Sequence, residues 1–153
     1  RLLKSEEAWG SKFDIVSNLF TSFGYFSKEE DHLSVLKGFS HALKPGGLLI
    51  LDYLNDKYSK ARLVPSEVIE LGGYTFNIKR FLKDGFFQKS ISFRSPEGKD
   101  YNFVEQVRAW SADDLKSLLL GVGLQPEKIY GDYEFGRHSE NSPRCIIVAR
   151  KQD

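Results

Sequence analysis

The chain has 153 residues, of which 22 are basic and 21 acidic, so its formal net charge is +1. This length is about one domain, and the balanced charge disfavours nucleic acid or an anionic membrane as partner. The single cysteine, Cys145, excludes an internal disulfide, and no apolar run has the roughly 20 residues of a membrane span. We therefore expect a folded protein of a reducing compartment, most simply the cytoplasm, that binds a small molecule.

The first recognisable element is the apolar run FDIVSNLF at residues 13–20, which is too short for an average helix and predicts a strand buried on both faces. Ser27 and Glu30 then form an S-x-x-E capping box, which predicts a helix start. Apolar residues follow at three- and four-residue spacing, so one stripe faces the sheet and His32 is expected on the solvent side. The stripe consists of Leu33, Leu36, Phe39 and Leu43.

A Pro-Gly-Gly turn separates this helix from the next strand. Pro45 cannot continue a helix, and Gly46 supplies the positive φ that a type II turn requires. The run LLILDYL at residues 48–54 then predicts an interior parallel strand, reached by a right-handed crossover. Residues 56–63 predict a polar linker.

Residues 64–109 alternate with period 2 between turn signals and predict an antiparallel insertion. Its expected strands are 67–71, 74–81, 86–93 and 101–109. The face of the second strand that carries Tyr74 and Phe76 ends at Arg80, and an equivalent face of the third strand is interrupted by Lys89. After the insertion Ser111 predicts a helix start, and residues 129–133 and 145–149 predict two closing strands.

In this order the elements resemble the C-terminal portion of class I S-adenosylmethionine-dependent methyltransferases, of the small-molecule type with a β insertion before the last helix. The segments that carry the resemblance are DIVSNLFTSFGYF, LKPGG before a strand ending in LDYLN, and WSADDLKSLLLGVGL before two strands. The resemblance implies an α/β fold with a partial Rossmann-like sheet, strands four to seven of seven, and an antiparallel β insertion.

Strands one to three of that family, with their Gly-rich cofactor loop, have no counterpart in this sequence, which also lacks Met. We therefore expect residues 1–153 to be a truncated, single C-terminal portion of the catalytic domain, and the chain alone to be an incomplete enzyme. Its fourth strand would then be a bare apolar edge, which invites pairing with another copy or another chain.

The resemblance implies S-adenosylmethionine as cofactor and places the loop after the fourth strand beside its methionine part and the transferred methyl. This loop consists of Asn18, Leu19, Phe20 and Thr21. Methyl transfer mainly needs alignment of donor and acceptor, so we assign no catalytic residue. Ligands of open α/β sheets lie beyond the carboxyl ends of the strands, and the insertion would serve as a substrate lid. The acceptor candidates are Tyr25, Phe26, Tyr53, Asn55, Arg80 and Arg108.

Plainer interpretations stay open for these residues. The two loop aromatics can be packing residues, and the two arginines can belong to a solvated face. His138 lies in a polar loop, where it is either a general base or simply exposed, whereas His32 and His41 are expected at the surface. Cys145, in an apolar strand, is expected to be a buried small hydrophobe. The carboxylates near the helix start and strand end are explained without a metal ion.

Two other functions also remain open. The same half-sheet can be a non-catalytic scaffold or dimerisation module, with the aromatic faces of the insertion as its interface. A nicotinamide-dependent α/β oxidoreductase is disfavoured, because the Gly-rich loop of such enzymes has no counterpart here.

Overall fold

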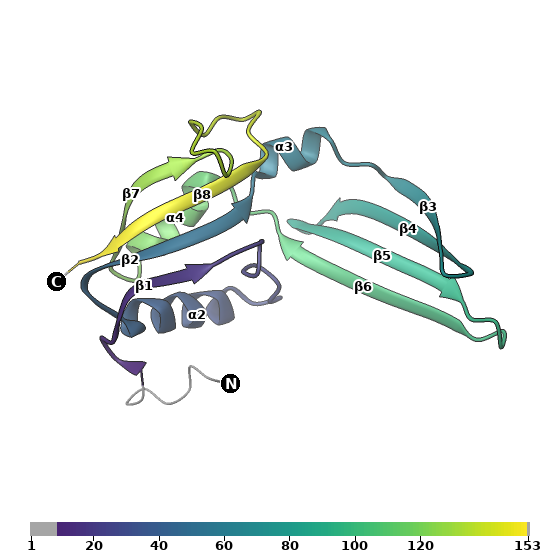
Figure 1. The fold of residues 1–153 in the computed structure, drawn as a ribbon, viewed down its shortest axis with the longest axis horizontal. Coiled ribbons are helices and arrows are strands. Elements are labelled where there is room, and N and C mark those ends of the chain that lie inside the picture. The colour runs from purple at the N-terminus through teal and green to yellow at the C-terminus, as the bar shows by residue number, and fades with distance from the viewer. Residues whose placement is uncertain (1–8, 153) are drawn as a thin grey trace.

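The computed structural model describes residues 9–152, which form two four-stranded sheets. The first has the strand order β1-β2-β8-β7 and the second the order β3-β4-β5-β6. The second sheet extends away from the body of the molecule, on the side where β1 and β2 reach their carboxyl ends (Figure 1).

Two parallel strands and an antiparallel pair make up the first sheet. β1 (Phe13–Asn18) pairs in parallel with β2 (Leu43–Leu54), and the chain crosses between them through α2 (Glu29–Ala42). β8 (Arg144–Lys151) lies antiparallel between β2 and β7 (Leu124–Tyr130). This is the arrangement predicted from the sequence for a partial Rossmann-like sheet, and the α/β fold class is confirmed.

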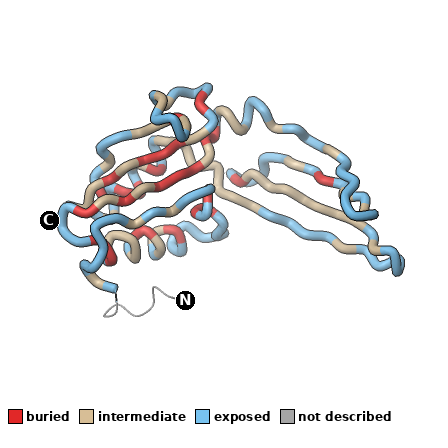
Figure 2. The backbone as a smooth tube through the Cα atoms, viewed as in Figure 1, coloured by how far each residue is buried: buried red, intermediate tan, exposed pale blue. Residues whose placement is uncertain are grey.

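The core lies on one face of this sheet. Alternate residues of the two central strands, such as Leu51 and Ile147, are fully buried there against α2 and against α4 (Ala112–Leu120). The two helices also contact each other. Figure 2 shows the buried residues concentrated in this body, whereas the second sheet is mostly partly buried or exposed. No helix within residues 9–152 is long and apolar enough to cross a membrane.

β1 is an edge strand, and the prediction that it is buried on both faces is wrong. Among the described residues it pairs only with β2, and Phe13 and Ile15 are exposed. Val16 packs against the core on the face that the helices cover, whereas Phe13 and Ile15 alternate with it and point to the opposite face, where they remain exposed. The run therefore has the composition of an interior strand but the position of an edge strand, and within residues 9–152 no strand pairs with its outer row of backbone groups.

The start of α2 also differs from the prediction. Its N-cap is Lys28, whose side chain has no acceptor that could cap the helix, and the Ser27 hydroxyl accepts a hydrogen bond from Gln106 Nε2 at 3.1 Å. His32, expected at the surface, is 1% exposed. Its ring packs edge-on against Phe23 and lies one helical turn from Leu36 on the same face.

Three boundaries in the rest of the body shift. β2 already begins at Leu43, and the Pro-Gly-Gly segment forms an irregularity in its pairing with β1, with Gly46 at a φ of 73°. α3 (Asp56–Ala61) replaces the predicted linker. β7 begins before the predicted 129–133 and contains Pro126, which is tolerated because β7 is an edge strand.

The second sheet is an antiparallel meander close to the predicted boundaries. Its strands are β3 (Ser66–Leu71), β4 (Tyr74–Lys83), β5 (Phe86–Arg94) and β6 (Asp100–Arg108). The Tyr53 hydroxyl donates to the Arg108 carbonyl at 2.5 Å, and the Arg108 N–H donates to the Gly24 carbonyl at 2.8 Å. These bonds join the base of the sheet to β2 and to the loop between β1 and α2.

Candidate functional site

A buried carboxylate organises the edge where β1 and β2 end. Asp52, near the end of β2, is 1% exposed. Its Oδ1 accepts from Arg144 Nε at 2.8 Å and from Nη2 at 2.6 Å, and its Oδ2 accepts from the Tyr133 hydroxyl at 2.9 Å. Oδ2 also accepts from the Phe20 N–H at 2.8 Å. A buried charge is tolerated only when it is paired and hydrogen-bonded in this way.

The loop after β1 is held in a strained conformation by this carboxylate. Phe20 and Thr21 have φ values of 56° and 57°, in the left-handed region that costs a non-glycine residue about 1–2 kcal/mol. The Thr21 N–H donates to the Asp52 carbonyl at 3.1 Å, and Arg144 Nη2 donates to the Thr21 hydroxyl at 2.9 Å. Strain that the surroundings maintain is a feature of functional sites, and here it falls on residues that the sequence assigned to the cofactor.

The same loop presents both apolar surface and an unused polar atom. The Leu19 side chain is exposed, and Phe20 is 75% exposed. Asn18 Oδ1 is buried and accepts no hydrogen bond within the described residues. A buried acceptor without a donor is costly, so this oxygen fits a ligand that supplies an N–H group.

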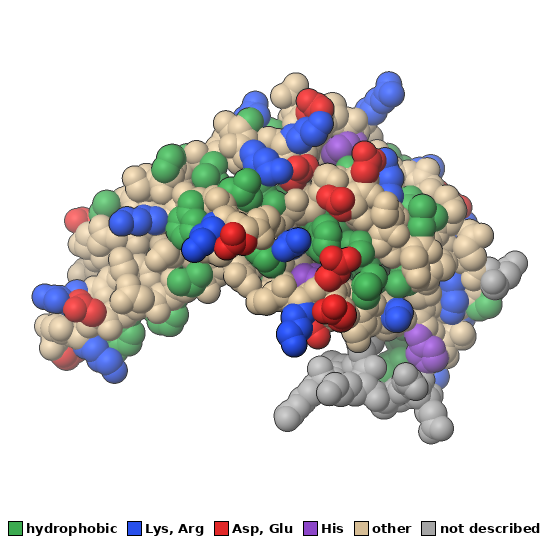
Figure 3. Space-filling model, turned by 180° about the vertical axis from the view of Figure 1, so that it is seen from behind, with side chains coloured by type: hydrophobic (Ala, Val, Ile, Leu, Met, Phe, Trp, Pro, Cys, Tyr) green, Lys and Arg blue, Asp and Glu red, His purple; other side chains and the backbone are tan. Residues whose placement is uncertain are grey.

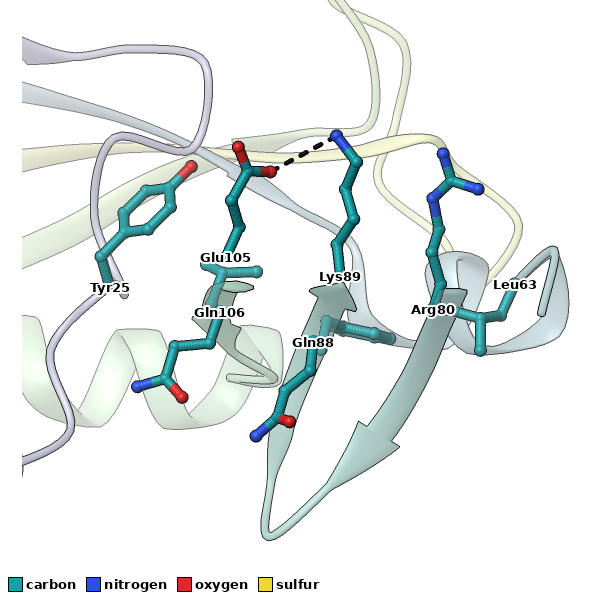
Figure 4. Close-up of a pocket in the computed structure, with 9 residues that line it drawn as sticks. Tyr25, Leu63, Arg80, Gln88, Lys89, Glu105 and Gln106 are labelled. Carbon is teal, nitrogen blue, oxygen red and sulfur yellow. Dashed lines mark hydrogen bonds and ion pairs between the residues drawn. The ribbon is translucent and has the colours of Figure 1, made fainter. Parts of the chain in front are cut away.

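Two of the predicted acceptor residues meet at a cavity. This cavity of about 180 Å³ lies between the loop after β1 and the second sheet and is lined by Tyr25 and Arg80 among others. In Figure 4, Tyr25, Arg80, Lys89 and Glu105 point to one side of the sheet. The remaining lining residues are Leu63, Phe87, Gln88, Gln106 and Val107. Lys89 and Glu105 were absent from the predicted site, although Lys89 interrupts an apolar period-2 face.

The other predicted acceptor residues are engaged within the protein. Tyr53 is fully buried, and burial raises the pKa of its hydroxyl, which donates to the Arg108 carbonyl. Asn55 is buried, and its Nδ2 donates to the carbonyls of Ser139 and Ser142, each at 2.8 Å. The ring of Phe26 packs edge-on against His32 at 5.3 Å.

Arg108 contributes to a second, smaller cavity. Its guanidinium lies over the rings of Phe86 and Trp110, at 4.8 and 5.2 Å from their centroids. The cavity, of about 130 Å³, is also lined by His32 and Glu29. The buried His32 Nε2 and Trp110 Nε1 have no hydrogen-bond partner within the described residues.

Acidic and basic side chains are interspersed on the face seen in Figure 3, without a large patch of one sign.

The remaining titratable candidates lie outside the Asp52 network. Burial, followed by the charge of Lys116, lowers the pKa of His138, whose Nε2 is buried and unpartnered among the described residues. Cys145 is buried, and burial raises the pKa of its thiol to about 12, so the prediction of a small buried hydrophobe is confirmed. Residues 9–152 contain no group of three or more potential metal ligands placed to hold an ion.

The chain is similar to known methyltransferases in sequence and in fold. A glycine/sarcosine N-methyltransferase of Aphanothece halophytica is 30% identical over 148 residues, which cover 92% of this chain and 52% of that protein. A methyltransferase structure from Clostridium acetobutylicum superposes with a TM-score of 0.77 at 20% identity, over 94% of this chain and 60% of that one.

A second solved structure gives a similar result. CcbJ methyltransferase from Streptomyces caelestis has a TM-score of 0.75 at 17% identity, over 94% of this chain and 59% of that one. No protein-family model matches the sequence. The chain therefore has the class I S-adenosylmethionine-dependent methyltransferase fold. It spans about half the length of the curated relative that it matches.

Proposed function

We propose that this chain forms the C-terminal part of the catalytic domain of an S-adenosylmethionine-dependent methyltransferase that acts on a small molecule. The observation that carries the proposal is the strained loop at Phe20 and Thr21, which Asp52 and Arg144 hold at the carboxyl ends of β1 and β2. The relative's name supports a small acceptor, because glycine and sarcosine are small amines.

The residues of this loop fit the methionine part of the cofactor. Asn18 Oδ1, which accepts no hydrogen bond from residues 9–152, suits the ammonium group, which supplies N–H donors. The exposed side chains of Leu19 and Phe20 offer apolar contact beside the sulfonium. When bound, S-adenosylmethionine supplies a methyl group on a positively charged sulfur. A nucleophile of the acceptor attacks the methyl carbon in line, and the carbon–sulfur bond breaks.

The protein's own contribution would be alignment and exclusion of water. In-line transfer gains most of its acceleration from a correctly oriented near-attack geometry. Tyr25 lies in the loop that leads from Thr21 to α2. It also lines the cavity of about 180 Å³ between this loop and the second sheet, so it connects the proposed cofactor loop with the cavity that would hold the acceptor. In this proposal β3–β6 act as the substrate lid that covers the acceptor.

The test is a calorimetric titration of the purified chain with S-adenosylhomocysteine, the product left after methyl transfer. We expect saturable one-to-one binding, together with chemical-shift changes of the amides of residues 18–21. Asp52→Asn should weaken the binding, because the loop loses its anchor, whereas Asp14→Asn at the other end of β1 should not. An Asp52→Asn variant that binds as tightly as the parent contradicts the cofactor assignment. A folded chain that binds no product would mean that this portion alone does not form the cofactor site, and the titration would then be repeated with the longer parent protein.

We also propose that the chain self-associates, either through the bare edge of β1 or through the second sheet. Five aromatic rings cluster on one face of that sheet, with neighbouring centroids 4.9–6.5 Å apart. They belong to Tyr74, Phe76, Phe93, Tyr101 and Phe103. Light scattering should show a dimer, which Phe103→Glu dissociates if the aromatic face is the interface and Ile15→Glu if the β1 edge is. A monomeric parent chain contradicts this proposal.

A further inference from the structure

We infer that the methyl acceptor carries a carboxylate, which binds between Arg80 and Lys89 in the cavity beneath the second sheet. This inference rests on the proposed function, since it names the substrate class of the same site. Its basis is a pair of cations in a position where a folded sheet does not normally place them.

Arg80 and Lys89 lie directly opposite each other on the two central strands of the second sheet. Both point to the side of the sheet on which Tyr25 lies (Figure 4). Like charges directly opposite on one face of an antiparallel pair destabilise the sheet. An anion that contacts both cations at once would remove this repulsion.

The acidic neighbours of the two cations lie on the outer strands of the sheet. Arg80 Nη2 donates to Glu67 on β3 at 2.5 Å, and Lys89 Nζ donates to Glu105 on β6 at 3.4 Å. Each carboxylate therefore holds its cation from the outer side. Because the two acids already balance the two cations, a doubly charged phosphate would give the row a larger excess of negative charge than a singly charged carboxylate.

The existing ion pairs leave donors available for a ligand. Arg80 is a planar fork with five N–H donors, and the geometry of such a fork matches a carboxylate in a bidentate manner. The Lys89–Glu105 pair is long and partly exposed, and pairs of this kind contribute little to stability. Exchange of Glu105 for a ligand carboxylate at Lys89 therefore costs little.

The remaining lining fixes the size and orientation of the acceptor. Leu63, Phe87 and Val107 give the cavity apolar surface, which strengthens ionic contacts by excluding water. Its volume of about 180 Å³ is below the ~300–1,000 Å³ of pockets for drug-sized ligands, so it suits a smaller molecule. With the carboxylate at the two cations, the atom that accepts the methyl group would face Tyr25 and the cofactor loop.

The test uses acetate as a minimal carboxylate and acetamide as its uncharged match. The amides of the isotopically labelled chain are followed by NMR at constant ionic strength. We expect acetate to shift the amides of Gln88, Lys89 and Val107 saturably, and acetamide to leave them unchanged. Lys89→Gln and Arg80→Gln should each weaken acetate binding about tenfold or more, because each removes a charge-assisted hydrogen bond. Lys79→Gln is the matched control, since Lys79 precedes Arg80 and lies on the other face of β4.

Several outcomes would overturn the inference. These are equal shifts with acetamide, undiminished acetate binding by the folded Lys89→Gln variant, or tighter binding of inorganic phosphate than of acetate. If Arg80→Gln fails to fold, Arg80→Lys keeps the charge without the planar fork and should bind acetate measurably more weakly than the parent. The measurement involves neither cofactor nor methyl transfer. A parent chain that binds S-adenosylhomocysteine but not acetate therefore refutes only the acceptor class. A parent chain that binds acetate but not S-adenosylhomocysteine leaves the acceptor inference standing.

Discussion

Arg144 donates from both Nε and Nη2 to the same oxygen of Asp52, across a separation of 92 residues in the sequence. This leaves the other carboxylate oxygen for the Phe20 N–H and the Tyr133 hydroxyl. One buried ion pair thus connects β2, the start of β8, the loop before β8 and the loop after β1. The conformation of the proposed cofactor loop depends on this connection.

Asp52→Asn should therefore strongly destabilise the fold. The substitution leaves the charge of Arg144 without its partner in a largely buried position, and breaking a buried pair costs roughly 3–5 kcal/mol. Urea denaturation followed by circular dichroism would measure the loss. Asp14→Asn is the matched control, because Asp14 forms an exposed ion pair with Lys44 at 2.8 Å on the same sheet. We expect no measurable change there, and equal losses for both variants would show that Asp52 is not an anchor.

Phe20→Gly should separate stability from binding. Glycine adopts a φ of 56° without the cost that a Cβ imposes, and the exposed Phe20 ring loses little burial, so we expect stability to rise by up to about 1 kcal/mol. Binding of S-adenosylhomocysteine should nevertheless weaken, because the apolar contact and the rigid loop are lost. Thermal melting and calorimetry would measure the two effects.

Ser11→Gly provides the control for Phe20→Gly. Ser11 also has a positive φ, 49°, and precedes β1 at the end opposite the loop. This variant should gain a similar stability without any change in product binding. A clear loss of stability in Phe20→Gly would instead indicate that the Phe20 ring packs on the protein.

Most elements of the body and of the insertion were predictable because short-range patterns specify them, whereas the arrangement of the strands in the first sheet was implied by the resemblance to class I methyltransferases. Continuous apolar runs, the positive φ at Gly46 and period-2 segments between glycine-containing turns all act within a few residues. The role of Asp52 was not predictable in this way, because its partners come from three distant segments. The sequence showed only an acidic residue inside an apolar strand, which was interpreted as a charge at the strand end.

His32 shows a second limit of the sequence. A polar residue beside an apolar helical stripe predicts exposure, yet its Nδ1 and the Lys28 carbonyl are 3.0 Å apart, so that one polar atom is satisfied within the helix. Its ring then packs against aromatic rings that include Phe23 and Trp110. Trp110 is remote in the sequence. The only local sign that His32 would be buried was the aromatic-rich segment before α2.

The candidate site was predicted unevenly for a related reason. Tyr25 and Arg80 do meet at one cavity, because strand alternation and the position of the loop follow from the sequence. Tyr53 and Asn55 were predicted from their place at a strand end, which specifies the edge of a sheet but not which side chains turn inward to protein partners.

Gly24→Ala should destabilise the chain by about 3 kcal/mol. Gly24 has a φ of 101°, and a Cβ there would overlap the Tyr53 hydroxyl, so backbone strain and overpacking add. Gly72→Ala, with a φ of 60° and open space around it, should cost only the strain of about 1 kcal/mol. Urea denaturation would compare them. Adding Tyr53→Phe to Gly24→Ala should recover part of the loss, and strict additivity of the two substitutions would contradict the proposed overlap.

The acid sensitivity of folding should depend on His138. Burial lowers its pKa in the folded chain below the ordinary value of about 6.5, so the unfolded chain binds the proton more readily. The contribution of neutral His138 to stability is therefore complete above pH ~6.5 and is lost as the pH falls through the folded pKa. Urea midpoints measured between pH ~7.5 and ~5 should fall with pH, and less steeply in His138→Gln. NMR titration of the ring should give a pKa below that of an unfolded histidine. A higher pKa, or an unchanged pH dependence in the folded variant, would show that the imidazole is not desolvated as the structure indicates.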